Sequence, residues 1–147
     1  TVTTDSPQQI EEALDLTGER AAPRRWDEQS FFEAAAELPE AVRTGLRKAY
    51  DFFTERSFEV WFGRGATEGT VSVAIPNLSE TFAIQLFIDG SIWVYFSNIP
   101  GDAAAELRGS LSRIGIDMPQ RNYGKVAPER WLGKLDELLM VIDGFRR

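Results

Sequence analysis

The chain has 147 residues, 43% of them apolar, which is enough for one domain whose core needs neither a metal ion nor a disulfide. It contains no histidine and no cysteine, which excludes Ser-His-Asp and Cys-His catalysis and the usual structural zinc sites. The formal net charge of −7 disfavours nucleic-acid binding by this chain alone, because contacts between cationic side chains and phosphates supply most of that affinity.

Residues 1–25 are predicted to form a short helix and a linker ahead of the main domain. In the segment SPQQIEEALDLTG, Ser6 is a typical N-cap, Pro7 fits the first helical position and Gly18 ends the helix. Its apolar side chains form one narrow stripe: Ile10, Ala13 and Leu14. The following ERAAPRR has no periodicity, so we expect residues 26–147 to form a single α+β domain.

Two predicted helices open this domain and two close it. The first covers residues 26–38 with Asp27 as its N-cap, and the second covers 39–56 and is opened by Pro39. The third is predicted over 101–115, capped by Asp102 and ended by Gly115. The last, over 127–145, carries apolar residues at a helical period: Trp131, Leu135, Leu138, Ile142 and Phe145.

Between these helices the apolar period changes to two, which is typical of strands. Four strands are predicted, over residues 58–62, 70–75, 81–87 and 91–96. Their short polar connections favour an antiparallel meander. The expected fold is therefore α+β, a four-stranded antiparallel meander flanked by N-terminal and C-terminal helices.

The hydrophobic pattern also predicts the register of the last two strands. If Gly90 has a positive φ in a three-residue turn, Leu86 lies opposite Ile92 and Phe87 opposite Ser91. One face of the sheet is then apolar: Phe58, Val60, Phe62, Val71, Val73, Ile75, Phe82, Ile84, Leu86, Ile92, Val94 and Phe96. A slip of one residue would turn this whole set to the other face, so the pattern favours this turn.

The second face of the predicted sheet mixes small and aromatic side chains: Glu59, Trp61, Thr70, Ser72, Ala74, Thr81, Ala83, Gln85, Phe87, Trp93 and Tyr95. Two interpretations stay open. Either a helix packs there on the small residues, or the face is a shallow, aromatic-rimmed groove for a partner or ligand. The candidate surface of the second interpretation comprises Trp61, Arg64, Gln85, Trp93 and Tyr95.

The glycine-rich segment WFGRGATEG, residues 61–69, is predicted to be a hairpin turn. It lacks the spacing and the lysine of a P-loop, and its third glycine comes one residue late for a dinucleotide-binding fingerprint. Arg64 at the tip of the turn remains a possible contact for an anion. No lysine has an acidic residue two positions before it, as a restriction-type nuclease core requires. We therefore predict no catalytic residue, no metal site and no cofactor.

Several of these motifs together resemble an uncharacterised bacterial domain that often occurs at the C-terminal end of larger proteins. They are the aromatic-x-Gly-x-Gly segment WFGRG, the later Gly69, the hairpin LFIDGSIWVYF and the closing amphipathic helix. The segment SNIPGD departs from that pattern, where the domain carries a more basic stretch. The resemblance implies an accessory role and assigns no catalytic residue.

The leading functional hypothesis is a non-catalytic interaction or regulatory module of a larger bacterial protein, in the cytoplasm, with a protein or neighbouring domain as partner. Because the chain begins at Thr1, we expect a processed chain or a piece of a longer protein. One alternative is a sensor for a small planar or anionic ligand, stacked on Trp61, Trp93 and Tyr95. Others are an accessory domain of a nucleic-acid-processing or defence enzyme, and a hydrolase that uses carboxylates alone. No apolar run is long enough for a membrane span.

Overall fold

The computed structural model describes residues 26–63, 69–79 and 81–146, and these form an α+β fold. Its centre is an antiparallel meander sheet in the order β1-β2-β3-β4-β5. The strands are β1 (Glu59–Phe62), β2 (Thr70–Ala74), β3 (Ile84–Phe87), β4 (Ile92–Tyr95) and β5 (Tyr123–Val126). The predicted meander is confirmed, but the predicted number of four strands was wrong. The helix predicted over residues 6–18 and the candidate residue Arg64 lie outside the described residues.

The fifth strand follows the third predicted helix and pairs with β4 along the edge of the sheet. Trp93 lies opposite Lys125, and Tyr95 lies opposite Tyr123. Gly124 faces the core side, where a Cβ atom would lie 2.5 Å from Met118 Cε. The sequence YGKV was missed because only Val126 offers the buried apolar side chain that marks a strand.

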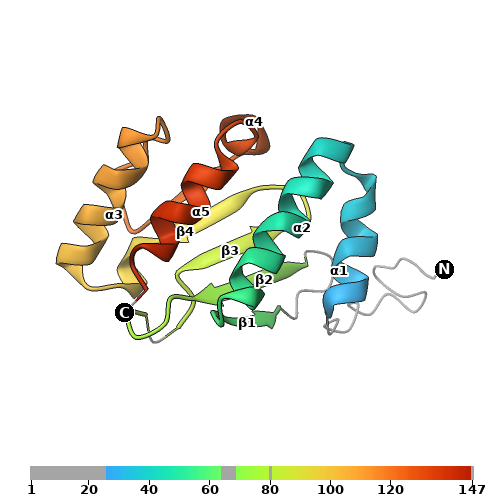
Figure 1. Ribbon diagram of the computed structural model, residues 1–147, viewed down its shortest axis with the longest axis horizontal. Coiled ribbons are helices and arrows are strands. Elements are labelled where there is room, and N and C mark those ends of the chain that lie inside the picture. Colours follow the sequence, from blue (N-terminus) through green and yellow to red (C-terminus); the bar gives the residue numbers. More distant parts are fainter. Residues whose placement is uncertain (1–25, 64–68, 80, 147) are drawn as a thin grey trace, which may run out of the picture.

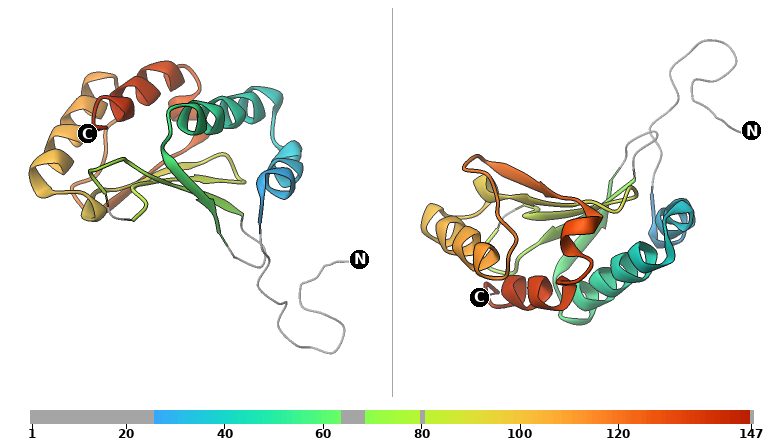
Figure 2. Two further views of the ribbon diagram at one scale, coloured as in Figure 1. Left: turned by 60° about the horizontal axis from the view of Figure 1, so that its bottom comes forward. Right: turned by 90° about the horizontal axis from the view of Figure 1, so that it is seen from above.

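The described helices lie beside the sheet and on one of its faces. They are α1 (Glu28–Ala34), α2 (Glu40–Glu55), α3 (Gly101–Arg113), α4 (Pro128–Trp131) and α5 (Leu135–Asp143), with 3₁₀ turns η1 (Ala35–Glu37) and η2 (Phe96–Asn98). Figure 1 shows α2, α5 and α3 side by side across the sheet. In the view from above in Figure 2, these helices cover one face, and no described helix lies on the other.

Most helix ends follow the sequence, with two corrections. Asp27 is the N-cap of α1, because its carboxylate accepts from the Ser30 N–H at 2.8 Å in a capping box. Asp102 is not the cap of α3, since the cap position falls on Pro100 and Asp102 lies in the first turn. The predicted last helix is broken into α4 and α5, although every residue of its apolar stripe is buried.

Trp131 ties the C-terminal helices to the sheet and to α2. Its side chain is fully buried, and its indole N–H donates to the Gly90 carbonyl at 2.9 Å. Its ring lies so close to Gly45 of α2 that a Cβ atom there would be 2.7 Å from Cη2. The core therefore accepts the tryptophan because residue 45 has no side chain.

The predicted register of the hairpin between β3 and β4 is confirmed. Leu86 lies opposite Ile92, and the Phe87 N–H donates to the Ser91 carbonyl at 3.0 Å. Gly90 has a φ of +91°, the left-handed conformation that the three-residue turn requires. The turn thereby sends Trp93 and Tyr95 to the face away from the helices.

The start of β3 differs from the prediction, which placed Phe82 in the apolar layer and Ala83 on the second face. The Ala83 N–H donates to the carbonyl of Val73, the residue opposite Ile84, so two residues face one, as in a β-bulge. Ala83 is fully buried in the core, and the Phe82 ring instead contacts Trp61 and Tyr95. A bulge shifts the alternation by one residue, which explains the exchange.

Candidate interaction face

We call the side of the sheet that faces away from α2, α3 and α5 the open face. The strand register places on it Glu59, Trp61, Thr70, Ser72, Ala74, Gln85, Phe87, Trp93, Tyr95, Tyr123 and Lys125, and the ring contacts of Phe82 add that residue. No described helix covers this face in either view of Figure 2.

An aromatic band crosses the open face from β1 to β5. Phe82 meets Tyr95 edge to face with ring centroids 4.9 Å apart, and Trp61 lies beyond it at 6.4 Å. On the other side of Tyr95, the Trp93 ring lies 6.4 Å away and nearly parallel, at 16°. Tyr123 continues the band, 5.7 Å from Trp93 and inclined by 24°. The rings form one continuous aromatic surface over the strands.

A chain of hydrogen bonds beneath these rings fixes the centre of the open face. The Tyr95 hydroxyl donates to Gln85 Oε1 at 2.6 Å, and Gln85 Nε2 donates to the Ser72 hydroxyl at 3.0 Å. Ser72 itself is only 3% exposed. Because their polar groups are paired within the face, Gln85 and Tyr95 keep one orientation.

A second chain of hydrogen bonds fixes Trp93. Its indole N–H donates to the Ser91 hydroxyl at 3.0 Å, and that hydroxyl donates to Asp89 Oδ1 at 2.6 Å. Phe87 packs against the same indole, with centroids 5.5 Å apart. The ring is thus held by the turn residues before anything binds.

Charge on the open face is concentrated at β5. Lys125 Nζ lies 5.9 Å from the centre of the Trp93 ring, and the Arg121 guanidinium lies 4.7 Å from that of Tyr123. Glu59 is at the opposite edge, on β1. Burial, and secondly the neighbouring Tyr123, raise the pKa of Tyr95 above its ordinary value.

The small residues of the open face are buried, so they do not line an exposed groove. Ser72 and Ala74 are 3% and 5% exposed, because larger side chains cover them. The edges of the band are more accessible, with Trp61 37% exposed and Tyr123 40% exposed. The face is therefore a surface of rings rather than a groove lined by small side chains.

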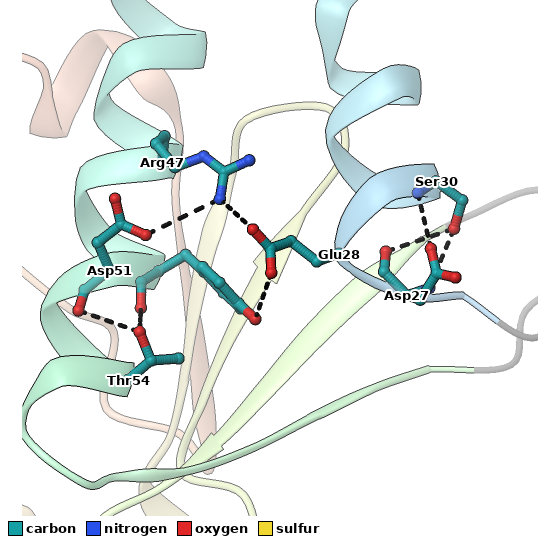
Figure 3. Close-up of polar contacts among 7 residues, drawn as sticks. Asp27, Glu28, Ser30, Arg47, Asp51 and Thr54 are labelled. Carbon is teal, nitrogen blue, oxygen red and sulfur yellow. Dashed lines mark hydrogen bonds and ion pairs between the residues drawn. The ribbon is translucent and has the colours of Figure 1, made fainter.

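The best-formed charged cluster lies elsewhere, between α1 and α2, and it is structural (Figure 3). Glu28 accepts from Arg47 at 2.7 Å and from the Tyr50 hydroxyl at 3.5 Å, which joins the two helices. Arg47 also lies 3.8 Å from Asp51, one turn along α2. Burial first, and then Glu28, raise the pKa of Tyr50. The carboxylates and the cation of this cluster thus bind one another.

Other features of the described residues offer less chemistry than the open face. A cavity of about 370 Å³ beside α3 is lined by Arg108, Ser112, Asp117 and Gln120, among others. Arg108 there donates to the carbonyls of Pro119 and Arg121, so its guanidinium has a structural role and links α3 to the segment before β5. Within residues 26–63, 69–79 and 81–146, no group of three acidic side chains is arranged to hold a metal ion.

Four of the five predicted surface residues come together on the open face: Trp61, Gln85, Trp93 and Tyr95. Arg64 lies outside the described residues, so its role stays a prediction. Sequence reasoning missed Tyr123 and Lys125 because it missed β5, and missed Phe82 because of the bulge. The alternation of Tyr123 and Lys125 around Gly124 was the available signal.

Comparison with known protein families, with curated proteins and with solved structures finds no match to this chain. The helices of the described part of the chain are all too short or too polar to cross a membrane. The geometry of the open face is therefore the feature from which a function is inferred.

Proposed function

We propose that the protein is a non-catalytic interaction module that binds a segment of another protein, or of a neighbouring domain, through the open face. The observation that supports this is the aromatic band on a sheet face without a described covering helix. Contiguous exposed apolar surface on a soluble domain is typical of interaction sites. Tryptophan and tyrosine are also the residues that most often dominate binding energy.

The fixed rings suit recognition because they reduce the entropy lost on binding. Trp93 is held through Ser91, and Tyr95 is held through Gln85. Side chains that are already ordered lose little further freedom when a partner arrives. The partner that fits such a face offers apolar side chains to the rings and an acidic group to Lys125 and Arg121.

Affinity capture with matched surface variants tests this proposal. Tyr123→Ala and Trp61→Ala truncate accessible rings on the open face, whereas Met140→Ala and Leu132→Ala truncate exposed side chains elsewhere. In lysate of the cells that make the protein, we expect a partner that wild type and both control variants retain and both open-face variants lose. Equal capture by all four variants, or no capture above background, would contradict the proposal.

A sensor for a planar ligand is the second candidate, favoured by the Trp93 ring, which lies nearly parallel to the Tyr95 ring and is inclined by 24° to the Tyr123 ring. These rings lie beside one another over the sheet, so they offer a ligand one surface, whereas small-molecule sites usually enclose most of the ligand. A thermal-shift screen of nucleotides and aromatic metabolites separates the candidates. Stabilisation that Trp93→Ala abolishes would favour the sensor, and no stabilisation at millimolar ligand would remove it.

The proposal also includes where the protein acts and what larger protein it is part of. The resemblance of the glycine hairpin and the LFIDGSIWVYF hairpin to a bacterial C-terminal domain supports an accessory part of a larger cytoplasmic protein. A nuclease or helicase domain in the same polypeptide would make the module an accessory part of that enzyme. Sequencing the genomic region that encodes residue 1 and what precedes it tests this directly.

A further inference from the structure

We infer that the partner segment bound by the open face is an amphipathic α-helix that lies along the aromatic band, with its C-terminal end at β5. The inference rests on the proposed function and deepens it, because it assigns a conformation, an apolar spacing and a direction to the segment that the same surface binds. Three properties of the face support it: the pairing of its polar groups, the spacing of its rings and the placement of its charges.

The polar groups at the centre of the open face are already paired with one another. The single N–H of the Trp93 indole donates to Ser91 at 3.0 Å. The single O–H of Tyr95 donates to Gln85 at 2.6 Å. Among the described residues of this face, no buried side-chain nitrogen or oxygen lacks a partner. The Trp93 and Tyr95 donors are therefore not available to the backbone of a bound segment.

A segment that lies over these rings must satisfy its own backbone, because N–H and C=O groups buried without partners cost free energy. An α-helix pairs them internally except at its ends, whereas a polyproline segment makes no internal hydrogen bonds. Strand addition at the β5 edge is also disfavoured. The Tyr123 carbonyl there accepts from Arg121 at 3.1 Å, and the Lys125 carbonyl accepts from Arg130 at 3.3 Å. The conformation that fits the band is thus the helix.

The spacing of the rings is close to the rise of a helix. Along the band, the centroids of Trp61, Phe82, Tyr95 and Tyr123 follow one another at 6.4, 4.9 and 6.4 Å. Side chains three or four residues apart on one face of a helix are separated by about 4.5–6 Å along its axis. The band crosses four strand spacings, or about 19 Å, which corresponds to roughly 13 helical residues. A helix with apolar side chains at this period can therefore meet ring after ring.

Charges at the two ends of the band give the helix a direction. Lys125 and Arg121 lie at the β5 end, and the exposed Lys125 forms no ion pair with the residues that the structure describes. The exposed Glu59 lies at the β1 end. The C-terminal end of a helix carries a partial negative charge, and the N-terminal end a partial positive one. The C-terminal end, with an acidic side chain beside it, therefore fits at β5 and the N-terminal end at β1.

Selection from two displayed peptide libraries, with the full chain as target, tests the inference. One library carries random residues on a helix-forming scaffold of about 14 residues, and the other differs only by central prolines that prevent a helix. We expect binders from the first library alone, with apolar residues at helical spacing and acidic residues near the C-terminal end. Synthetic copies of these peptides should bind Met140→Ala like wild type and Tyr123→Ala about tenfold more weakly or less.

Charge reversal tests the direction of the helix. Lys125→Glu should weaken the selected peptides and strengthen versions whose C-terminal acidic residues are replaced by lysine, whereas Lys48→Glu on α2 should change neither. Binders recovered equally from the proline library, or no binder from the helical library, would overturn the inference. So would helical binders that Tyr123→Ala leaves unaffected, because they would bind elsewhere.

Failure of this inference is distinguishable from failure of the proposed function. If the Tyr123→Ala and Trp61→Ala variants lose a cellular partner, the open face binds a protein, and a proline placed inside the partner's binding segment should abolish the binding. A captured partner that tolerates this proline would overturn the helix alone. Helical peptides that bind the face when no cellular partner is captured would instead count against the proposed function and support the preference for a helix.

Discussion

Trp93 and Phe96 are close in sequence, and their side chains lie on opposite sides of the sheet. Phe96 is 4% exposed in the core under the Arg108 guanidinium, whereas Trp93 is partly exposed on the open face. We predict that Phe96→Ala lowers the free energy of unfolding by about 3–5 kcal/mol, because it leaves a cavity. Trp93→Ala should cost nearer about 1–2 kcal/mol. Denaturant midpoints of the two variants test this, and equal large losses would mean that both faces are core.

Tyr95 gives the open face a pH dependence. Because burial and then Tyr123 raise its pKa in the folded protein, the folded state keeps this proton when the unfolded state has lost it. The associated stability is full below the unfolded pKa of about 10 and is lost as the pH rises through the higher folded pKa.

We therefore predict that stability falls less steeply above about pH 10 in Tyr95→Phe than in wild type, because the variant lacks this titration. Urea unfolding at several alkaline pH values measures the slope. The comparison uses slopes rather than absolute stabilities, since the variant also loses the hydrogen bond to Gln85. An unchanged slope would contradict the assigned shift. Tyr50, whose pKa is raised by burial and by Glu28, accounts for part of the remaining decline.

Residues of the candidate site could be predicted from the sequence where side chains alternate strictly between the two faces of a strand. They could not be predicted where a bulge interrupts that alternation. Trp61, Gln85, Trp93 and Tyr95 follow from a period of two and one correctly placed turn. Phe82 does not, because a bulge depends on a hydrogen bond from Ala83 to Val73 that no local pattern shows.

At the level of elements, two glycines within helices show the difference between the helix preference of a residue and the space that packing leaves for its side chain. Gly45 in α2 lies against the Trp131 ring, where a Cβ atom would lie 2.7 Å from Cη2. Gly109 in α3 has open space, with the nearest atom, on the flexible Arg113 side chain, 3.8 Å away. Alanine favours a helix over glycine by about 1 kcal/mol in either place.

We predict opposite signs for the two substitutions. Gly109→Ala should stabilise the protein by up to about 1 kcal/mol, through helix preference alone. Gly45→Ala should destabilise it by about 1–3 kcal/mol, because the fully buried ring has no room to move. Thermal or denaturant unfolding compares them directly. Stabilisation by both variants would mean that Trp131 is not packed against α2 as described.

Helices and strands could be predicted from the sequence where their apolar residues recur with a clear period over several positions. The helix α2 and the strands β1 to β4 have clear periods, and Asp27 marks the first described helix. The strand β5 has only four residues, two of them a glycine and a lysine, and it forms because β4 offers a free edge. The break between α4 and α5 covers residues 132–134 and includes Gly133, a residue with low helix preference.

At the scale of the molecule, the sheet is asymmetric. Its apolar face is covered by α2, α3 and α5, and its aromatic face has no described cover. Sequence reasoning anticipated both faces but left open whether a helix packs on the second. The answer depends on how the helices distribute over the sheet, which is a property of the whole chain.

A photo-reactive amino acid in place of Tyr123, compared with the same group in place of Met140, tests the central claim most directly. The two positions are both exposed, at 40% and 59%, and they lie on the open face and on α5. After irradiation in the cells that make the protein, we expect a covalent adduct with a second protein from position 123 and none from position 140. Adducts of equal yield from both positions, or none from position 123, would contradict an interaction face.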